Sequence, residues 1–158
     1  MLYLSMGALA ANDTATATST SAERQVRAWF RQHSIDDDGL VLDNGSGLSR
    51  IERIRPSQLA KVLKVAYGSD WAPEFMASLP IVAVDDGMRN RLRESPAAGH
   101  ARIKTGSLRD VSAAAGFVPD ANNQLCIVVA MINHPLAKGG VGPPILDALI
   151  DWVARSGQ

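Results

Sequence analysis

The sequence predicts an α/β domain in which helices pack against an antiparallel sheet. Three patterns predict this class. Residues 21–33 and 56–66 carry apolar side chains at helical spacing, residues 103–133 form extended apolar segments separated by turns, and residues 143–153 return to helical spacing. Because the extended segments follow one another with no helix between them, the strands are expected to run antiparallel rather than as a doubly wound parallel sheet.

Length and composition are those of one globular domain without a nucleic-acid partner. The 158 residues are 46% hydrophobic, which is enough for a core that hides roughly 70% of the unfolded surface. The 16 basic and 16 acidic side chains cancel, so no basic field is available for DNA or RNA. The single cysteine, Cys126, excludes an intrachain disulfide and is expected to be a buried, unreactive thiol. No segment approaches the ~18 apolar residues of a membrane span, and no cofactor is expected.

Residues 1–20 are expected to hold the end of a helix followed by a flexible loop. The stretch MLYLSMGALAAND has no basic residue ahead of its apolar part and is interrupted by Ser5 and Gly7, so it matches a secretion signal poorly. We expect it to be the end of an apolar helix that begins before residue 1. Residues 11–20 are small and polar, as in a loop.

The elements up to residue 94 have local signals of their own. Residues 20–23 have capping-box spacing and predict the start of a helix whose buried face ends at His33. The run Asp36–Gly39 lacks the alternating ligands and the closing glutamate of a calcium loop, and is expected to be a turn. Residues 40–42 are expected to form a short strand, and residues 73–94 two short helical pieces.

The second half of the chain contains the predicted sheet and a closing helix. Residues 112–118 and 125–133 are expected to form a β-hairpin around the turn PDANNQ, after the strand that contains Lys104. The pair Pro143-Pro144 suits the first turn of a helix. That helix is expected to pack on the sheet through Ile145, Leu146, Leu149, Ile150, Trp152 and Val153.

The sequence gives little support for a phosphate-binding loop or a metal site. The glycine-containing segments 44–49 and 99–106 lack the residue order of a dinucleotide or phosphate loop. The three histidines are scattered without ligand spacing, so no metal site is expected. What remains is Ser49 in a tight glycine-rich loop, and Lys104 followed by Thr105 on a strand. Taken singly, Ser49 is explained by a turn cap and Lys104 by protection of a strand edge.

Taken together, the two segments resemble a known family. The segment DNGSGLSR, followed much later by KTGSL, a small-residue strand, a turn and a β-branched strand, resembles the C-terminal part of the penicillin-binding D-Ala-D-Ala carboxypeptidases and endopeptidases of low-molecular-mass class C, peptidase family S13. The resemblance covers most of residues 40–155, and LYLSMGA resembles the end of a helix that follows the nucleophile segment in that family. It implies a β-lactamase/transpeptidase-like fold, of which residues 21–158 would be the C-terminal part.

The resemblance also implies a reaction and a set of site residues. Enzymes of this family cleave the D-Ala-D-Ala end of peptidoglycan stem peptides in the periplasm through an acyl-serine, which β-lactams trap. By resemblance, Ser49 and Lys104 are catalytic, and Ser49 relays a proton. Lys104 supplies a cation for the terminal carboxylate, together with the hydroxyls of Thr105 and Ser107. Gly106 lets the ligand backbone approach, and the Ser107 N–H is one of two oxyanion-hole donors.

The sequence departs from the family pattern in two places. No serine is followed by lysine three residues later, so these 158 residues lack the Ser-x-x-Lys nucleophile motif. The second motif, usually Ser-x-Asn, continues after Ser49 with Arg50, Ile51 and Glu52 and therefore lacks the asparagine amide. We therefore expect the chain to be the C-terminal part of a longer enzyme, inactive alone. An uncovered apolar sheet face would allow it to form a homodimer.

Two other hypotheses remain open. The chain could be a non-catalytic module of the same fold that binds a peptidoglycan stem peptide or another partner. It could also be an unrelated small α/β protein in which the two motifs occur by chance. The family interpretation requires Ser49 and Lys104 to face one cleft, whereas a distance well beyond ~10 Å between them would favour chance.

Overall fold

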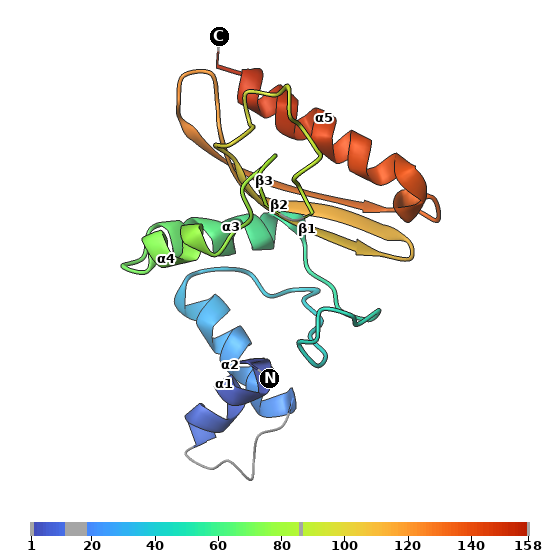
Figure 1. Cartoon of the computed structure of the whole chain (residues 1–158). Helices are drawn as coiled ribbons and strands as arrows, with labels where there is room; N and C mark the ends of the chain where they lie inside the picture. Colours follow the sequence, from blue (N-terminus) through green and yellow to red (C-terminus); the bar gives the residue numbers. More distant parts are fainter. Residues whose placement is uncertain (1, 12–18, 86, 158) are drawn as a thin grey trace. The chain divides into compact units, whose positions relative to one another are not determined.

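The structure, a computed structural model, describes residues 2–11, 19–85 and 87–157 of the chain. The loop expected at residues 11–20 therefore lies largely outside the described residues. The chain divides into two compact units, Met1–Gln58 and Leu59–Gln158. Each unit is described in turn, with the elements labelled as in Figure 1.

The first unit is built on two helices, α1 (Leu2–Ala11) and α2 (Ser19–Gln32), that pack against each other. Gly7 allows their close approach, because a Cβ at this position would lie 2.4 Å from Ser21 Oγ and 2.7 Å from the Ala22 nitrogen. The α2 helix already includes Ser19 and Thr20, so the capping box expected at residues 20–23 is wrong. The Glu23 carboxylate instead accepts a hydrogen bond from Arg27, one turn further along the helix.

The rest of the first unit has little regular structure. The strand expected at residues 40–42 is reduced to one bridge, in which Val41 and Arg53 exchange two backbone hydrogen bonds of 3.0 Å. Leu40 itself is buried, as are Phe30 and Ile35, so these apolar side chains are among the buried residues of the first unit. The apolar period of α2 predicted the burial of Phe30, but His33, which was expected to end the buried face, is exposed. The pairing of the following segment depended on contacts distant in sequence.

The second unit contains the sheet. Helix α3 (Pro56–Tyr67) begins with Pro56 as expected and is followed by the short helix α4 (Ala72–Ala77). The strands β1 (Arg102–Leu108), β2 (Val111–Pro119) and β3 (Leu125–Asn133) form an antiparallel sheet in the order β1-β2-β3, which confirms the predicted sheet and hairpin. A π-helical turn η2 (Ala137–Val141) leads into the closing helix α5 (Gly142–Arg155).

The two faces of the sheet have different helical covers (Figure 1). On one face, Ile103, Ala114 and Val118 belong to the same buried cluster as Leu146 and Ile150 of α5. On the other face, Phe117 contacts Tyr67 at the end of α3, with ring centroids 5.5 Å apart, and Phe75 of α4, at 6.4 Å. The period of two along each strand thus divides the side chains between α5 and the α3–α4 pair.

The segment between α4 and β1 differs from the prediction of a second helix. Residues 78–85 and 87–101 form successive turns that place Val82, Met88 and Ala97 in the core beside α5. Positive φ angles at Ala83 (64°) and Leu92 (58°) are incompatible with a continuous right-handed helix. Of the two helical pieces expected within residues 73–94, the first is present as α4 and the second is wrong.

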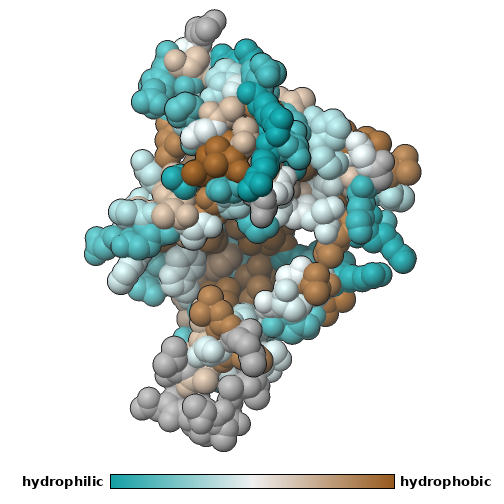
Figure 2. Space-filling model, viewed as in Figure 1, coloured by the Kyte–Doolittle hydropathy of each residue, from teal (hydrophilic) through white to brown (hydrophobic). Residues whose placement is uncertain are grey.

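The closing helix packs on the sheet through fewer residues than expected. Pro143 and Pro144 lie in its first turn as predicted, and Leu146, Ile150 and Val153 are buried, with Leu149 packed beside them. Ile145 and Trp152, however, are 53% and 66% exposed, because they lie beside the buried face of the helix and not on it. They are among the exposed large hydrophobic residues of the chain, and Figure 2 shows hydrophobic side chains among hydrophilic ones on the visible surface.

An ion pair joins the turn-rich segment to the closing helix. Arg91 donates through Nε and Nη2 to the carboxylate of Asp147, with a shortest distance of 2.7 Å, and also through Nη2 to the Pro143 carbonyl at 3.3 Å. Both side chains are less than one quarter exposed. This forked geometry fixes the turns around Arg91 against helix α5.

Two glycines in the sheet differ in the space available for a side chain, and this difference gives a test of the fold. At Gly116 of β2, a Cβ would lie 2.0 Å from the Arg102 carbonyl oxygen across the strand pair. At Gly106 of β1, it would meet only the Ala113 Cβ, at 4.0 Å. We expect Gly116→Ala to lower the free energy of unfolding by about 3 kcal/mol or more, and Gly106→Ala, the matched control, to change it by less than about 0.5 kcal/mol. Urea denaturation of both variants measures this, and equal losses would contradict the described register.

Candidate functional site

The free edge of β1 is the main candidate site of the second unit. The Ile103 N–H donates to the Pro80 carbonyl at 2.9 Å and therefore points away from β2. Backbone N–H groups alternate in direction along an edge strand, so those of Thr105 and Ser107 also point away from β2. Within the described part of the chain, neither of these two N–H groups has a hydrogen-bond partner. The edge from Thr105 onward is therefore able to bind another chain.

The expected cation lies at this same edge. Lys104 is exposed, and its Nζ donates to the carbonyl oxygen of Thr105 at 2.6 Å. That carbonyl points to the free side of β1, like the Thr105 N–H. The ammonium group is therefore held beside the unpaired N–H groups, although Lys104 leaves the strand on the face opposite to α5.

The hydroxyl side chains leave β1 on the other face. Thr105 and Ser107 alternate with Lys104 and lie on the same side as the buried Ile103. Thr105 is half-buried and Ser107 is exposed. The expected grouping of Lys104 with these hydroxyls can therefore arise only at the rim of the sheet, where groups from both faces reach the free edge.

Gly106 has no structural reason to be glycine. It is exposed, its φ is not positive, and the nearest atom to an added Cβ is 4.0 Å away. A side chain here would stand on the Lys104 face of β1. Among the described residues, nothing crowds this position, and its predicted role in the approach of a ligand stays a prediction.

Ser49 lies in a glycine-rich loop of the first unit. Its Oγ accepts a hydrogen bond from the Ile51 N–H at 3.3 Å, and Ser46 makes the same kind of contact with the Leu48 N–H at 3.2 Å. Gly45, with φ of 67°, allows the loop to approach Tyr3, whose Cβ would lie 2.4 Å from an added Cβ. Ser49 thus caps a turn, as the simpler explanation predicted, and its O–H remains able to donate elsewhere.

The two predicted catalytic residues belong to different units. Ser49 lies in Met1–Gln58 and Lys104 in Leu59–Gln158. The structure brings Lys104, Thr105, Gly106 and Ser107 together on one strand edge, because they are consecutive in β1. The cleft shared by Ser49 and Lys104 stays a prediction.

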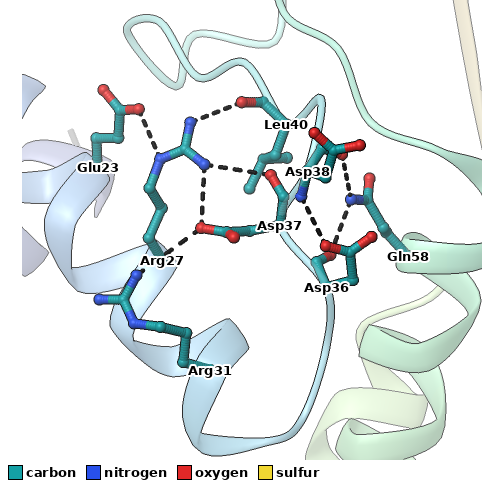
Figure 3. Close-up of polar contacts among 8 residues, drawn as sticks. All are labelled: Glu23, Arg27, Arg31, Asp36, Asp37, Asp38, Leu40 and Gln58. Atoms are coloured by element: carbon teal, nitrogen blue, oxygen red, sulfur yellow. Dashed lines mark hydrogen bonds and ion pairs between the residues drawn. The ribbon is translucent and has the colours of Figure 1, made fainter.

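The acidic run Asp36–Asp38 is part of a polar cluster rather than a metal centre (Figure 3). Arg27 donates to Glu23 at 2.8 Å, to the Asp37 carboxylate at 3.1 Å and to the Leu40 carbonyl at 2.6 Å. Arg55 pairs with the carboxylates of both Asp36 and Asp38. Gln58 donates to the carbonyls of the same two aspartates, at 2.8 and 3.0 Å. The expected turn is confirmed, with its negative charges balanced by arginines.

Other candidate groups carry no site. Among the described residues, no group of three or more histidine, cysteine, aspartate or glutamate side chains could hold a metal ion. His134 accepts the Leu136 N–H through Nδ1 at 3.1 Å, as a loop histidine does. Cys126 is half-buried, where a buried thiol was expected, because it lies on β3 near a strand end. No helix within the described ranges is long and apolar enough to cross a membrane.

The fold and the strand edge define a class of protein. An antiparallel sheet with α5 on one face, and a Lys-Thr-Gly sequence on a free edge strand, is an arrangement of the penicillin-binding, transpeptidase-like fold. Residues 4–156 match the model of the D-Ala-D-Ala carboxypeptidase 3 (S13) family, which is nearly the whole chain. The chain therefore belongs to this family.

Curated relatives agree with this assignment. The chain is 34% identical over 105 residues to a D-alanyl-D-alanine carboxypeptidase of Actinomadura sp. (strain R39), a match that covers 63% of this chain and 20% of the relative. It is 30% identical over 110 residues to D-alanyl-D-alanine carboxypeptidase DacB of Haemophilus influenzae, covering 68% of this chain and 23% of the relative. The chain thus spans about a fifth to a quarter of the length of these relatives.

Solved structures agree on the fold. Penicillin binding protein 4 (dacB) from Haemophilus influenzae is similar to the chain with a TM-score of 0.67 and 28% identity, over 73% of this chain and 26% of that protein. The same protein complexed with a novel β-lactam gives a TM-score of 0.79 over 95% of this chain and 37% of that protein, at 21% identity. The predicted fold class is confirmed.

The polar cluster of the first unit gives a second test. Arg27 binds Glu23 within α2, joins the helix to the acidic turn through Asp37 and Leu40, and is 28% exposed at its side chain. Its removal leaves the Leu40 carbonyl and two carboxylates without this donor, so Arg27→Ala is expected to destabilise the first unit by about 1–2 kcal/mol. Lysine cannot reproduce the forked geometry and should restore only part of this loss.

Hydrogen exchange of the α2 amides measures this effect. Arg24→Ala on the same helix is the control, since Arg24 is exposed and has no ion pair among the described residues. If the α2 amides are as well protected from exchange in Arg27→Ala as in Arg24→Ala, the Arg27 cluster contributes nothing to the stability of the helix.

Proposed function

We propose that the chain is the substrate-carboxylate-binding part of a serine-type D-Ala-D-Ala carboxypeptidase or endopeptidase that acts on peptidoglycan stem peptides. The observation that carries this proposal is the position of the Lys104 ammonium, at the free edge of β1 beside unpaired N–H groups. Membership of the S13 family supplies the reaction class. Its site of action would be the periplasm or the cell wall.

The free edge has the chemistry that a peptide terminus requires. A ligand strand can add to β1 through the Thr105 and Ser107 backbone groups, as peptides add to exposed sheet edges. Its terminal carboxylate would then lie near the Lys104 ammonium, which is drawn from the Thr105 carbonyl to form a charge-assisted hydrogen bond. The Thr105 and Ser107 hydroxyls would add donors at the rim, and Gly106 leaves the approach clear.

The N–H of Ser107 would also serve the reacting carbonyl. It points to the free side of β1 and has no partner in the described part of the chain, so it is available as an oxyanion-hole donor. A fixed backbone donor of this kind costs no reorganisation when negative charge develops on the oxygen. In the proposed reaction, that charge develops as an acyl-serine forms with the substrate or with a β-lactam.

Ser49 is proposed to relay a proton between the lysine of the nucleophile motif and the leaving amine. Its hydroxyl oxygen already accepts the Ile51 N–H, but its proton is free to move to a base. This role requires the Ser49 loop and the β1 edge to face one cleft. It is therefore tested separately from the role of Lys104.

Catalysis also requires a nucleophile that these residues do not contain. Because no serine of the 158 has lysine three residues later, the chain alone should form no acyl-enzyme. The same observation favours a second function, a non-catalytic module that binds stem peptides or a partner. The homodimer expected for the isolated chain is a further proposal, which its molecular mass in solution would test.

Fluorescent penicillin distinguishes the two functions. The 158-residue chain is expected to show no covalent labelling, whereas the full-length gene product should be labelled on a serine outside this sequence if it is the enzyme. Absence of labelling in the full-length product would favour the binding module. Labelling of Ser49 in the isolated chain would overturn the roles proposed for the site residues.

Removal of the cation should slow the reaction of the full-length product. Lys104→Ala deletes one charge-assisted hydrogen bond, so the rate of β-lactam acylation should fall roughly 10- to 100-fold. The control is Lys61→Ala, since Lys61 is an exposed residue of α3. Unchanged acylation in Lys104→Ala would remove the central support for the proposal.

The role of Ser49 has its own matched control. Ser49→Ala and Ser46→Ala each remove a hydroxyl that accepts a backbone N–H two residues later. If Ser49 relays a proton, Ser49→Ala should lower the acylation rate at least roughly 100-fold, while Ser46→Ala should not. Equal rates in the two variants would leave Ser49 with the turn cap alone.

A further inference from the structure

The outer edge of β3 has unpaired backbone groups. In the order β1-β2-β3, β3 pairs with β2 and no other described strand. The Ile103 N–H points away from β2, so its cross-strand partner Gly116 directs its own backbone groups toward β3, where it faces Val128. Backbone groups alternate in direction along β3, so every second residue points outward. The outward-pointing residues are Ile127, Val129 and Met131. Among the described residues, none of these three has a backbone partner on the outer side.

The composition of β3 is unusual for an edge strand. Its sequence, LCIVVAMIN, is uncharged and is apolar on both faces up to Asn133, as in strands buried on both faces. Edge strands are usually protected by charges, proline, a bulge or a covering segment. The other edge strand, β1, carries Arg102 and Lys104, and Pro80–Val82 lie beside its start, where Ile81 forms a bridge with Arg102. In the described part of the chain, β3 has no such protection, so its edge is suited to pairing with another strand.

Helix α5 has one flank on the β1 side of the sheet. On this flank, the Asp147 carboxylate accepts hydrogen bonds from Arg91, with a shortest distance of 2.7 Å. Arg91 belongs to the turns that continue from Pro80–Val82, beside β1. Successive residues of a helix are about 100° apart, and Leu146 of α5 is buried in the core cluster with the sheet. Ile145 therefore lies on the flank opposite to Asp147, toward β3.

The β3 flank of α5 carries an exposed apolar stripe, made of Ile145, Leu149 and Trp152. Ile145 and Trp152 are mostly exposed, and Leu149 packs partly on the core. The end of α5 lies near the β2–β3 turn, since the Ala121 N–H donates to the Ser156 carbonyl at 2.9 Å. The helix therefore runs antiparallel to β3, with Trp152 toward the start of the strand and Ile145 toward its end. Because no residue of the stripe is charged, the strand edge and the stripe form one apolar surface.

We propose that this surface binds a second copy of the chain, with the two β3 strands paired antiparallel about a twofold axis at Val129. In this register, Val129 exchanges both backbone hydrogen bonds with its equivalent, and Ile127 pairs with Met131 of the partner subunit. Every outward backbone group in the middle of the strand is then satisfied, and one sheet continues through both copies. The same axis brings Trp152 toward Ile145 of the partner subunit, so the two stripes meet.

Charge and size favour a second copy as the occupant. Neither the edge nor the stripe is charged, and the chain has 16 basic and 16 acidic side chains, so two copies do not repel each other. An antiparallel edge is complementary to itself, as an interface about a twofold axis requires. A strand of 9 residues is about 30 Å long, and with α5 beside it the contact is roughly 20 Å deep. The dimer would bury on the order of 600 Å² per copy, within the range of stable interfaces.

The proposed dimer leaves the candidate site open. Strands β1 and β3 are opposite edges of the sheet, so pairing at β3 does not cover the segment Lys104–Ser107. The inference therefore goes beyond the proposed function and does not depend on it.

Amide hydrogen exchange of the ¹⁵N-labelled 158-residue chain, combined with its mass in solution, tests the pairing. At high concentration the chain should have twice the monomer mass, and the amides of Ile127, Val129 and Met131 should be protected from exchange. On dilution to the monomer, the protection of these outward amides should fall at least tenfold. The amides of Val128 and Ala130 face β2 and should stay protected.

Two charge variants of α5 form a matched pair. Trp152→Glu places a carboxylate in the stripe and should raise the dissociation constant of the dimer at least tenfold, since a buried tryptophan contributes strongly to an interface. Ala148→Glu adds the same charge on an exposed side of α5 that faces away from the sheet, and should change the dissociation constant less than twofold.

A proline variant tests the strand edge itself. Val129→Pro removes an outward N–H without removing a hydrogen bond to β2, a position at which edge strands tolerate proline. The variant should be monomeric, and continued protection of the Val128 and Ala130 amides would show that it is folded. If it does not fold, the comparison of Trp152→Glu with Ala148→Glu decides.

Three results would overturn the proposal. A chain that stays monomeric at every concentration, with freely exchanging outward amides, binds no second copy at this edge. A monomer in which these amides are protected covers the edge with residues of its own. A dimer in which they exchange freely, or in which Trp152→Glu and Ala148→Glu have equal effects, uses another surface.

Discussion

The pairing of β1 with the central strand β2 is the constraint on which the rest of the second unit depends. Because the N–H groups of an edge strand alternate, pairing one half of them with β2 leaves the other half on the free side. That half includes the donors of Ile103, Thr105 and Ser107. The first is used by the chain itself, through Pro80, and the other two remain unpaired among the described residues.

Adjacent residues of β1 alternate between burial in the core and exposure at the candidate site. Ile103 is fully buried against the α5 side, whereas Lys104 is exposed and its ammonium reaches the rim. Gly116 is required by the close approach of β1 and β2, while at Gly106 the only described atom within 4 Å of an added Cβ is the Ala113 Cβ. Under the proposed function, this unconstrained position is where the backbone of a ligand would approach β1.

Local patterns predicted the regular elements well and the irregular ones poorly. The β-branched run of β3 and the Pro143-Pro144 start of α5 were recognised because their signals lie within a few residues. The turns between α4 and β1 were missed, because their conformation depends on Val82 and Met88 packing against a helix more than fifty residues further on. Ile145 and Trp152 were assigned to the core because apolar character does not say which side of a helix faces the sheet.

The sequence by itself determined the family, the order of strands and the four consecutive residues Lys104–Ser107, since all of these depend on residue identity and short spacing. Only the tertiary structure decided which side of β1 is open, where that side is closed by Pro80–Val82, and that Lys104 reaches it. The physical reason is that backbone hydrogen bonds between distant segments carry no residue-specific signal. Their partners are known only once the chain has folded.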